Sequence, residues 1–211
     1  MNLNDVTVFI VDDDPAARDS VTALVESMNI RCEGFASAEE FLQAYDPNKP
    51  GCLVTDVRLL GMSGLELQEQ LAQRRASLPV VVITAHADVP LAVKAMRRGA
   101  INILEKPCRQ QELWETIRSA LNVDAANRKR RANREMVEAR LSTLSPEEHE
   151  IMKKVVEGVP NKVIAVDLNL SLRTVETRRH NVFRKMQVES LVDLVRLVVD
   201  ADDKRQEENL P

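Results

Sequence analysis

The sequence predicts an α/β protein with two domains, a doubly wound parallel sheet followed by a smaller all-helical domain. Five short apolar runs before about residue 122 alternate with segments of helical periodicity, and this alternation predicts the sheet. Apolar runs of this length are typical of buried parallel strands, which right-handed helical crossovers connect. The strand pattern ends at about residue 122, and only helical periodicity follows the polar stretch after it, which predicts the second domain.

In the first domain the expected order is strand then helix, repeated five times. We expect strands at 6–11, 30–35, 51–56, 79–84 and 101–105. The first helix opens at Pro15, because proline is favoured in a first turn and Asp14 precedes it. Further helices are expected at 38–44, 64–74, 89–98 and 110–121.

The second half begins with a polar stretch from Asp124 to Arg140 that contains neither Gly nor Pro, which favours a helical or partly helical linker. The basic run 128–131 within it is expected to be a solvated face, with phosphate contact as the lesser alternative. Four helices should follow, at 146–157, 161–168, 172–186 and about 190–201. The predicted domain bounds are 1–123, a linker at 124–141, 142–201, and a disordered tail at 202–211.

Composition limits the function classes. Of the 29 Lys+Arg and 33 Asp+Glu, residues 1–122 hold 12 and 17, so the remainder holds 17 and 16. The first part is therefore acidic, and any nucleic-acid surface in the second must come from local placement of charge. Cys32, Cys52 and Cys108 lack metal-binding spacing and fit reduced thiols. No apolar run approaches a membrane span, so we expect a cytoplasmic protein without membrane contact.

Four of the apolar runs stop on groups that phosphate chemistry needs. These groups are Asp12 with Asp13, Asp56, Thr84, and Lys106. Side chains at the carboxyl ends of parallel strands meet in one crevice, where ligands of open sheets bind. A single Asp at a strand end is more often a helix cap or turn former, and Asp14 could be only that. The ordered set of carboxylates, hydroxyl and ammonium favours a functional site.

The groups suit a phosphoryl-accepting switch. Asp13 and Asp56 could hold Mg²⁺ while Asp12 orients a water, because magnesium prefers a few carboxylates with retained waters. The Asp56 carboxylate can attack a phosphoryl donor if a cation such as Lys106 offsets the charge on the phosphoryl oxygens. The Thr84 hydroxyl would then donate to a phosphoryl oxygen, a contact that exists only in the modified state.

The segments VDDDP, TDVRLLGMSGLEL and VVVITAHADVPLAVKAMRRGAINILEKP resemble the receiver domain of two-component response regulators, in the FixJ-like branch. The resemblance covers residues 5 to about 122 and implies a flavodoxin-like sheet of order 2-1-3-4-5. It implies that Asp56 is the phosphoryl acceptor, that Asp12 and Asp13 are the acid pair, and that Thr84 and Lys106 are the switch residues. It further implies a metal ligand at the Arg58 backbone carbonyl and a cis Lys106–Pro107 bond.

Three positions depart from the family pattern. Ile103 stands where many receivers carry an aromatic that turns inward on activation, so we expect transmission through backbone shifts. Leu60 replaces a common proline in the loop after Asp56, which predicts a more mobile loop. Cys108 stands where an aromatic often follows the proline.

Residues 145–200 resemble the LuxR-type helix-turn-helix domain, through SPEEHEIMKKVVEGVPNKVIAVDLNLSLRTVETRRHNVFRKM. Apolar residues from Ile151 to Met186 should form a small helical core, which leaves a basic face on the helix from Leu172. By analogy with recognition helices, Glu176, Thr177 and His180 should face bases in the major groove. Phosphate contacts are expected from a basic and hydroxyl set: Lys162, Arg173, Thr174, Arg178, Arg179 and Arg184.

The leading hypothesis is a transcription regulator, not an enzyme, that binds double-stranded DNA after phosphorylation of Asp56 by a sensor histidine kinase. A phosphotransfer intermediate is the alternative, and an RNA-binding regulator ranks last because exposed aromatics are few. Two routes of activation stay open. One is dimerisation through residues 89–98 and 101–105, and the other is release of a masked DNA-binding domain. RNA polymerase is a further candidate partner.

Overall fold

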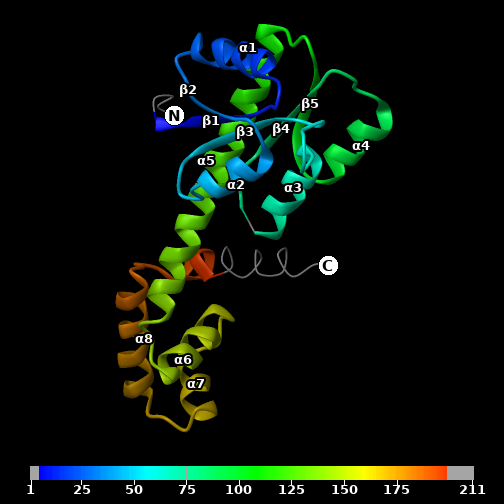
Figure 1. The fold of residues 1–211 in the computed structure, drawn as a ribbon. Helices are drawn as coiled ribbons and strands as arrows, with labels where there is room; N and C mark the ends of the chain where they lie inside the picture. The colour runs from blue at the N-terminus through cyan, green and yellow to red at the C-terminus, as the bar shows by residue number, and fades with distance from the viewer. Residues whose placement is uncertain (1–4, 75, 199–211) are drawn as a thin grey trace. The chain divides into compact units, whose positions relative to one another are not determined.

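The computed structural model describes residues 5–74 and 76–198 (Figure 1). Contacts along the chain divide it into two compact units that meet at Lys129 and Arg130. No helix in these described residues is long and apolar enough to cross a membrane.

The first unit contains one five-stranded sheet in which all strands are parallel and the order is β2-β1-β3-β4-β5. This order confirms the expected flavodoxin-like topology. The strands are β1 (Thr7–Val11), β2 (Arg31–Phe35), β3 (Gly51–Asp56), β4 (Val80–Thr84) and β5 (Ala100–Glu105). Each strand begins within one residue of its predicted start. The apolar runs of β1, β3 and β4 are buried almost completely, whereas β2 and β5 are buried only in part.

Helices cover both faces of the sheet (Figure 1). The helices are α1 (Pro15–Glu26), α2 (Ala38–Ala44), α3 (Gly64–Gln73), α4 (Val89–Arg97) and α5 (Gln110–Leu141). Side chains of α1 and α5 share one buried cluster with one face of the strands, and those of α2, α3 and α4 share a second cluster with the other. The fold is therefore doubly wound, as predicted.

The structure corrects the expected end of the fifth helix. We expected a helix from Gln110 to Leu121 and then a linker, but α5 runs without a break to Leu141. One reason is the absence of Gly and Pro, and another is a set of contacts near Arg128. The predicted helical linker is thus the second half of α5, and the predicted domain bounds stay a prediction.

Arg128 and Asp124 fasten this part of α5 to the loop before β3. Arg128 donates hydrogen bonds to the carbonyls of Asn48 (2.8 Å) and Pro47 (3.2 Å) and to the Asp124 carboxylate (2.8 Å). The Asp124 side chain is fully buried and also accepts the Gly51 N–H at 3.0 Å. Arg128, the first residue of the basic run 128–131, therefore makes structural contacts and is not part of a solvated face.

The second unit is helical in its described part. It contains α6 (Pro146–Val156), α7 (Asn161–Asp167) and α8 (Leu172–Met186), and residues 191–198 are also helical. The predicted core residues Ile151, Val155, Ile164, Val175 and Met186 are all buried in one cluster. The predicted end of the last helix and the predicted disordered tail lie outside the described residues.

The three cysteines are free thiols, as the sequence predicted. Burial raises the pKa of the Cys32 thiol to about 11 and also raises those of Cys52 and Cys108. The thiols are thus kept protonated and act as packing groups.

Candidate functional site

The crevice at the carboxyl ends of the strands contains the predicted groups. Asp12 follows β1, Asp56 is the last residue of β3, Thr84 ends β4, and Lys106 follows β5. The register places Thr84 opposite Glu105, and the Lys106 N–H donates to the Thr84 carbonyl at 2.8 Å. Sheet topology therefore brings together residues that are up to 94 positions apart in the chain.

Lys106 connects the two carboxylates that flank it. Its ammonium nitrogen lies 2.5 Å from Asp12 Oδ2 and 2.5 Å from Asp56 Oδ2. The side chains of Lys106, Asp12 and Asp56 are 19%, 5% and 12% exposed, so solvent screens these ion pairs only partly. One cation balances two carboxylates, which leaves the crevice with net negative charge.

The protonation of Lys106 follows from these contacts. Burial opposes the charged form, but the hydrogen bonds to Asp12 and Asp56 and the charges of both carboxylates outweigh it, so the pKa of Lys106 is raised. Lys106 is therefore a firmly held cation at neutral pH, as the stabilisation of a phosphoryl group requires.

Backbone donors fix the second oxygen of each carboxylate. Asp12 Oδ1 accepts the Asp14 N–H at 3.1 Å, and Asp56 Oδ1 accepts the Arg58 N–H at 2.9 Å. Arg18 Nη1 also donates to the Asp12 backbone carbonyl at 2.7 Å. No sequence pattern pointed to Arg18, because its contact joins the first turn of α1 to the end of a strand.

The remaining predicted members of the crevice differ in their surroundings. Thr84 is 1% exposed, and its hydroxyl oxygen accepts the His86 N–H at 3.4 Å. Asp13 is half-buried and Arg58 is exposed. Asp14 accepts the Ala16 N–H and caps α1, so for this aspartate the structural interpretation is confirmed.

The crevice also bears on the expected divalent cation. Carboxylate and carbonyl oxygens are the donors that Mg²⁺ prefers, and Asp12 and Asp56 each present an oxygen to the same ammonium. The chemistry of this donor set fits magnesium. Within residues 5–74 and 76–198, no three or more His, Cys, Asp and Glu side chains form a group that could hold a metal. In this structure the Lys106 ammonium pairs with both the Asp12 and the Asp56 carboxylates and helps to hold them in place.

The departures from the receiver pattern also have visible surroundings. Ile103 is half-buried and packs against the cluster shared by α2, α3 and α4. Leu60 is 77% exposed, and the Met62 N–H in the same loop donates to Glu39 at 3.0 Å. The Lys106–Pro107 bond is cis, as the resemblance implied.

In the second unit, α8 separates an apolar side from a polar side. Ser171 caps the helix by accepting the Thr174 N–H at 3.0 Å, and Val175, Val182 and Met186 are buried. The predicted base-contacting residues Glu176, Thr177 and His180 are all exposed. Because these three lie at i, i+1 and i+4, one turn of α8 presents them to solvent.

The residues predicted to contact phosphates differ in how exposed their side chains are and in whether they contact other side chains. Lys162, Arg173 and Arg184 are exposed, whereas Thr174 and Arg178 are half-buried. Thr174 shares a 2.8 Å hydroxyl contact with Ser171. Arg179 is the most engaged, because its Nη1 donates to Asn161 Oδ1 at 2.8 Å and its guanidinium lies 5.5 Å from the Phe183 ring centroid.

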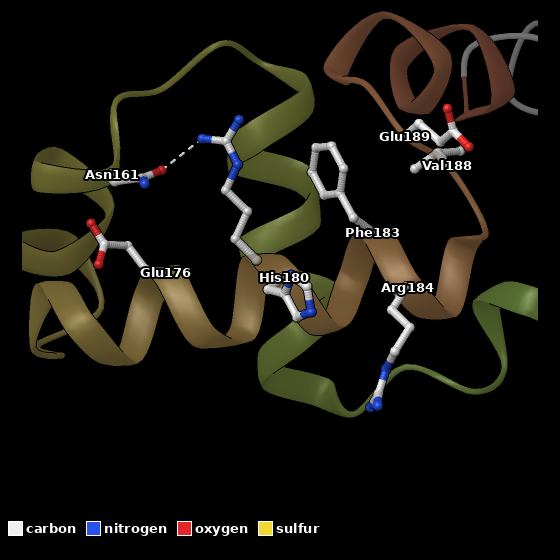
Figure 2. A pocket seen from close by; sticks show the side chains of 8 residues that line it. Asn161, Glu176, His180, Phe183, Arg184, Val188 and Glu189 are labelled. Carbon is white, nitrogen blue, oxygen red and sulfur yellow. Dashed lines mark hydrogen bonds between the residues drawn. The ribbon is translucent and has the colours of Figure 1, made fainter.

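A surface hollow of about 680 Å³ runs beside this helix (Figure 2). Asn161 from the start of α7 and Val188 and Glu189 after α8 border it, and the rest of its lining comes from α8: Glu176, Arg179, His180, Phe183 and Arg184. Predicted base and phosphate contacts thus share one concave surface with Asn161, which the sequence prediction omitted.

Comparison with known proteins agrees with both halves of this geometry. Residues 8–118 match the response regulator receiver domain, and residues 142–198 match the bacterial regulatory proteins of the luxR family. The chain is a DNA-binding response regulator. Phosphorylation-dependent control is standard for this family, and its members are transcription regulators.

Relatives of this response regulator match it along nearly its whole length. The transcriptional regulatory protein FixJ of Azorhizobium caulinodans is 43% identical over 201 residues, which cover 93% of this chain and 95% of FixJ. The response regulator protein TmoT of Ectopseudomonas mendocina is 38% identical over 197 residues, which cover 93% and 90% of the two chains.

Solved structures extend the same likeness. The response regulator StyR has a TM-score of 0.84 and 41% identity, with 92% of this chain and 98% of StyR covered. Full-length FixJ from B. japonicum has a TM-score of 0.58 and 38% identity, with 94% and 98% covered. This response regulator therefore resembles proteins that contain both of its parts.

Proposed function

We propose that a sensor histidine kinase phosphorylates Asp56 and that this modification controls the binding of α8 to double-stranded DNA, and thereby transcription. One observation carries the proposal: the Lys106 ammonium lies 2.5 Å from both Asp12 and Asp56, at the carboxyl ends of separate strands. A carboxylate nucleophile beside a fixed cation is the arrangement that phosphoryl acceptance requires.

In the transfer, an Asp56 carboxylate oxygen forms a bond to phosphorus while the bond from phosphorus to the kinase histidine nitrogen breaks. The leaving histidine takes up a proton, and the phosphoryl oxygens gather charge in the crevice. Lys106 Nζ, which contacts the Asp12 and Asp56 carboxylates in the unmodified protein, offsets this charge. The Thr84 hydroxyl, which sits at the end of the neighbouring strand, donates to a phosphoryl oxygen once it is present.

Receiver domains bind Mg²⁺ at their phosphorylation site, and the oxygens of this crevice fit that ion. We assign its protein ligands to Asp12, Asp13, Asp56 and the backbone carbonyl of Arg58. When bound, the ion supplies positive charge beside the phosphoryl oxygens. Asp12 and Asp56 are held in place for this role by the N–H groups of Asp14 and Arg58.

On DNA, α8 is proposed to enter the major groove with Glu176, Thr177 and His180 toward base edges. The exposed cations Lys162, Arg173 and Arg184 and the half-buried Thr174, Arg178 and Arg179 would contact phosphates. A helix with buried residues on one side and this set on the other supports the assignment.

Activation is proposed to form a homodimer through α4 and β5. Val89, Val93 and Met96 of α4 are 76%, 45% and 48% exposed, and large apolar side chains are costly to leave in water. A two-fold dimer would place two copies of α8 on paired half-sites. RNA polymerase is proposed as a further partner of the bound dimer, and the cytoplasm, where a bacterium keeps its DNA, as the place of action.

The decisive experiment treats the full chain with magnesium and a small phosphodonor. Intact mass should show one added phosphoryl group in the wild type and none in Asp56→Asn. Asp46→Asn is the matched control, because Asp46 lies in an exposed turn and its carboxylate accepts the Asn48 N–H within that turn. A phosphoryl group on Asp56→Asn would contradict the assignment.

The same samples test the output. Light scattering should show the wild type and Asp46→Asn converting from monomer to dimer, and duplex binding in a mobility-shift assay should strengthen in parallel. If phosphorylated wild type binds DNA more tightly as a monomer, release of a masked DNA-binding unit replaces dimerisation as the route. If phosphorylation changes neither mass nor DNA binding, the proposed control is wrong.

A further inference from the structure

Arg179 is the one predicted phosphate contact whose guanidinium is held by two other side chains. Asn161, the first residue of α7, accepts a hydrogen bond from Arg179 Nη1 at 2.8 Å, which Figure 2 shows as a dashed line from Asn161. One turn further along α8, the ring of Phe183 lies 5.5 Å from the guanidinium carbon. The two contacts come from different helices, so together they restrict both the direction and the plane of the guanidinium.

These restraints leave most of the donors of Arg179 available. A guanidinium has five N–H donors, and its positive charge is kept at any pH that the folded protein encounters. The Asn161 contact uses one donor, and the guanidinium carbon lies over the Phe183 ring, which has no acceptor oxygen or nitrogen to take a donor. Asn161 is neutral, so it orients the guanidinium without cancelling its charge, in contrast to the carboxylate partners that bind Lys154 and Lys185 in the same unit.

Burial also favours fixed placement. Arg179, Asn161 and Phe183 are all half-buried, whereas the predicted phosphate contacts Lys162, Arg173 and Arg184 are exposed. A free arginine side chain loses rotational freedom when a partner immobilises it, and this loss weakens binding. Arg179 has already lost much of that freedom in the folded protein, so its phosphate contact is less costly than those of the exposed cations.

We propose that Asn161, supported by the Phe183 ring, is a positioning residue that holds Arg179 in the orientation in which its outward N–H groups bind a DNA phosphate. The inference rests on the proposed DNA contact of α8, and it assigns a role to Asn161 that the sequence did not predict. It also places a DNA phosphate beside the Arg179 guanidinium, which is one of the groups that line the hollow in Figure 2.

The chain is suited to a test at Asn161. The N-cap of α7 is Pro160, and no side chain caps this helix, so Asn161→Ala removes no capping bond. Alanine is also a good helix former, so the variant should fold. Val166→Ala is the matched control, because Val166 lies on the same helix and is 80% exposed.

The probe is a fluorescently labelled mixed-sequence duplex, titrated with the phosphodonor-treated full chain over a series of salt concentrations. Asn161→Ala should weaken binding by about 2- to 10-fold, which corresponds to immobilising one long side chain during binding. Its salt dependence should match that of the wild type, because Arg179 still reaches the phosphate. Arg179→Ala should lower the slope of log K against log salt by about 0.9 for each bound α8.

The double variant Asn161→Ala/Arg179→Ala provides the sharpest readout. If Asn161 acts through Arg179, the double variant binds as weakly as Arg179→Ala alone. If the two losses multiply, Asn161 acts independently of Arg179 and the inference is wrong. Asn161→Asp should still hold Arg179 but should bind DNA more weakly than Asn161→Ala, because its charge opposes the phosphate.

A measurement without DNA keeps this inference separate from the proposed function. The Arg179 Nε–H resonance should report restricted motion in the wild type, in Asn161→Asp and in Val166→Ala, and free motion in Asn161→Ala. Equal mobility in all four proteins would overturn the positioning role even if DNA binds. Failure of the wild type to bind any duplex would instead overturn the DNA arm of the proposed function.

Discussion

The crevice of the first unit and the helix α8 of the second unit gather their functional groups in opposite ways. Asp12, Asp56, Thr84 and Lys106 come from the ends of four strands, so only the order and register of the sheet bring them together. The exposed side of α8 is instead the product of one continuous helix. The crevice therefore depends on tertiary structure throughout, whereas the composition of the DNA-facing side depends on local periodicity.

The two regions also differ in how far their charged side chains are buried and held by partners. In the crevice, Lys106 and two carboxylates are largely buried and fixed by one another and by backbone N–H groups. On α8, Arg173 and Arg184 are exposed. Substitutions near the crevice should therefore alter stability and chemistry together, whereas substitutions on α8 should alter binding with little loss of stability.

The largest expected effect comes from adding a methyl group at Gly64, behind the crevice. A Cβ at this position would lie 2.0 Å from the Asp56 carbonyl oxygen and 2.9 Å from Thr55 Oγ1, and the backbone cannot yield cheaply there. Gly64→Ala should reduce the free energy of unfolding of the first unit by about 3 kcal/mol or more and slow phosphorylation, because Asp56 must shift. Denaturant titration and intact mass against time would measure both.

Gly34→Ala is the control for this substitution. Its nearest neighbour would be Arg18 Cδ at 3.2 Å, which belongs to a flexible side chain that can move. Wild-type phosphorylation in Gly64→Ala would show that the placement of Asp56 does not depend on the packing of α3 against β3.

The second effect concerns α5, which contains matched ion pairs in the two units. Arg128 and Asp124 form an i,i+4 pair with Asp124 fully buried, whereas Arg131 and Glu135 form an i,i+4 pair that is 59% and 63% exposed. Arg128→Ala should cost about 2–3 kcal/mol of stability, because it leaves a buried carboxylate without its cation. Arg131→Ala should cost about 0.5 kcal/mol or less. Thermal unfolding would compare them, and equal losses would contradict the distinction.

The third effect is a capping interaction that occurs in both units. Ser63 with Glu66 caps α3, and Ser145 with Glu148 caps α6, each through a reciprocal capping box. Ser63→Ala and Ser145→Ala should each cost about 1 kcal/mol in their own unit and leave the other unit unchanged. Calorimetry of the full chain would resolve this, and a loss in the opposite unit would show that the two units unfold together. Ser142→Ala, which removes only a bond to a helix carbonyl, is the control.

The smallest expected effect is the pH dependence of stability. Burial opposes ionisation of Glu148, but hydrogen bonds from Lys185 and the Ser145 N–H outweigh it and hold the pKa of Glu148 below its usual value. The folded state therefore gains stability above that usual value of 4.5 and loses it as the pH falls through the lowered pKa. Glu148→Gln should flatten this acid loss in the second unit, and the exposed Glu150→Gln should not.

Lys106 gives the first unit the opposite dependence. Because the pKa of Lys106 is raised in the folded state, its contribution to the free energy of unfolding is complete below the ordinary lysine value. The contribution declines as the pH rises through the raised pKa. Chemical denaturation of the wild type as the pH rises above 10.5, the ordinary lysine value, should therefore weaken the first unit more than the second. Equal alkaline losses in the two units would remove this difference between them.

Local sequence patterns determined most of the elements and their types. Buried apolar runs set the strands, caps at Asp14, Ser145 and Ser171 set helix starts, and motif order predicted the crevice and the DNA-facing helix. The predicted end of the fifth helix at Leu121 was wrong, because periodicity weakened in a polar stretch that tertiary contacts of Arg128 stabilise. The assignments of individual site residues stay predictions.

Local sequence patterns are enough to show which chemical groups this response regulator possesses and on which elements they lie, because periodicity and capping act over a few residues. The folded structure shows which groups touch: Lys106 lies between Asp12 and Asp56, Arg18 contacts the Asp12 carbonyl, and Asn161 contacts Arg179. These contacts join residues separated by 6 to 94 positions and by turns of the chain. Packing of whole elements fixes such distances, and no local pattern encodes them.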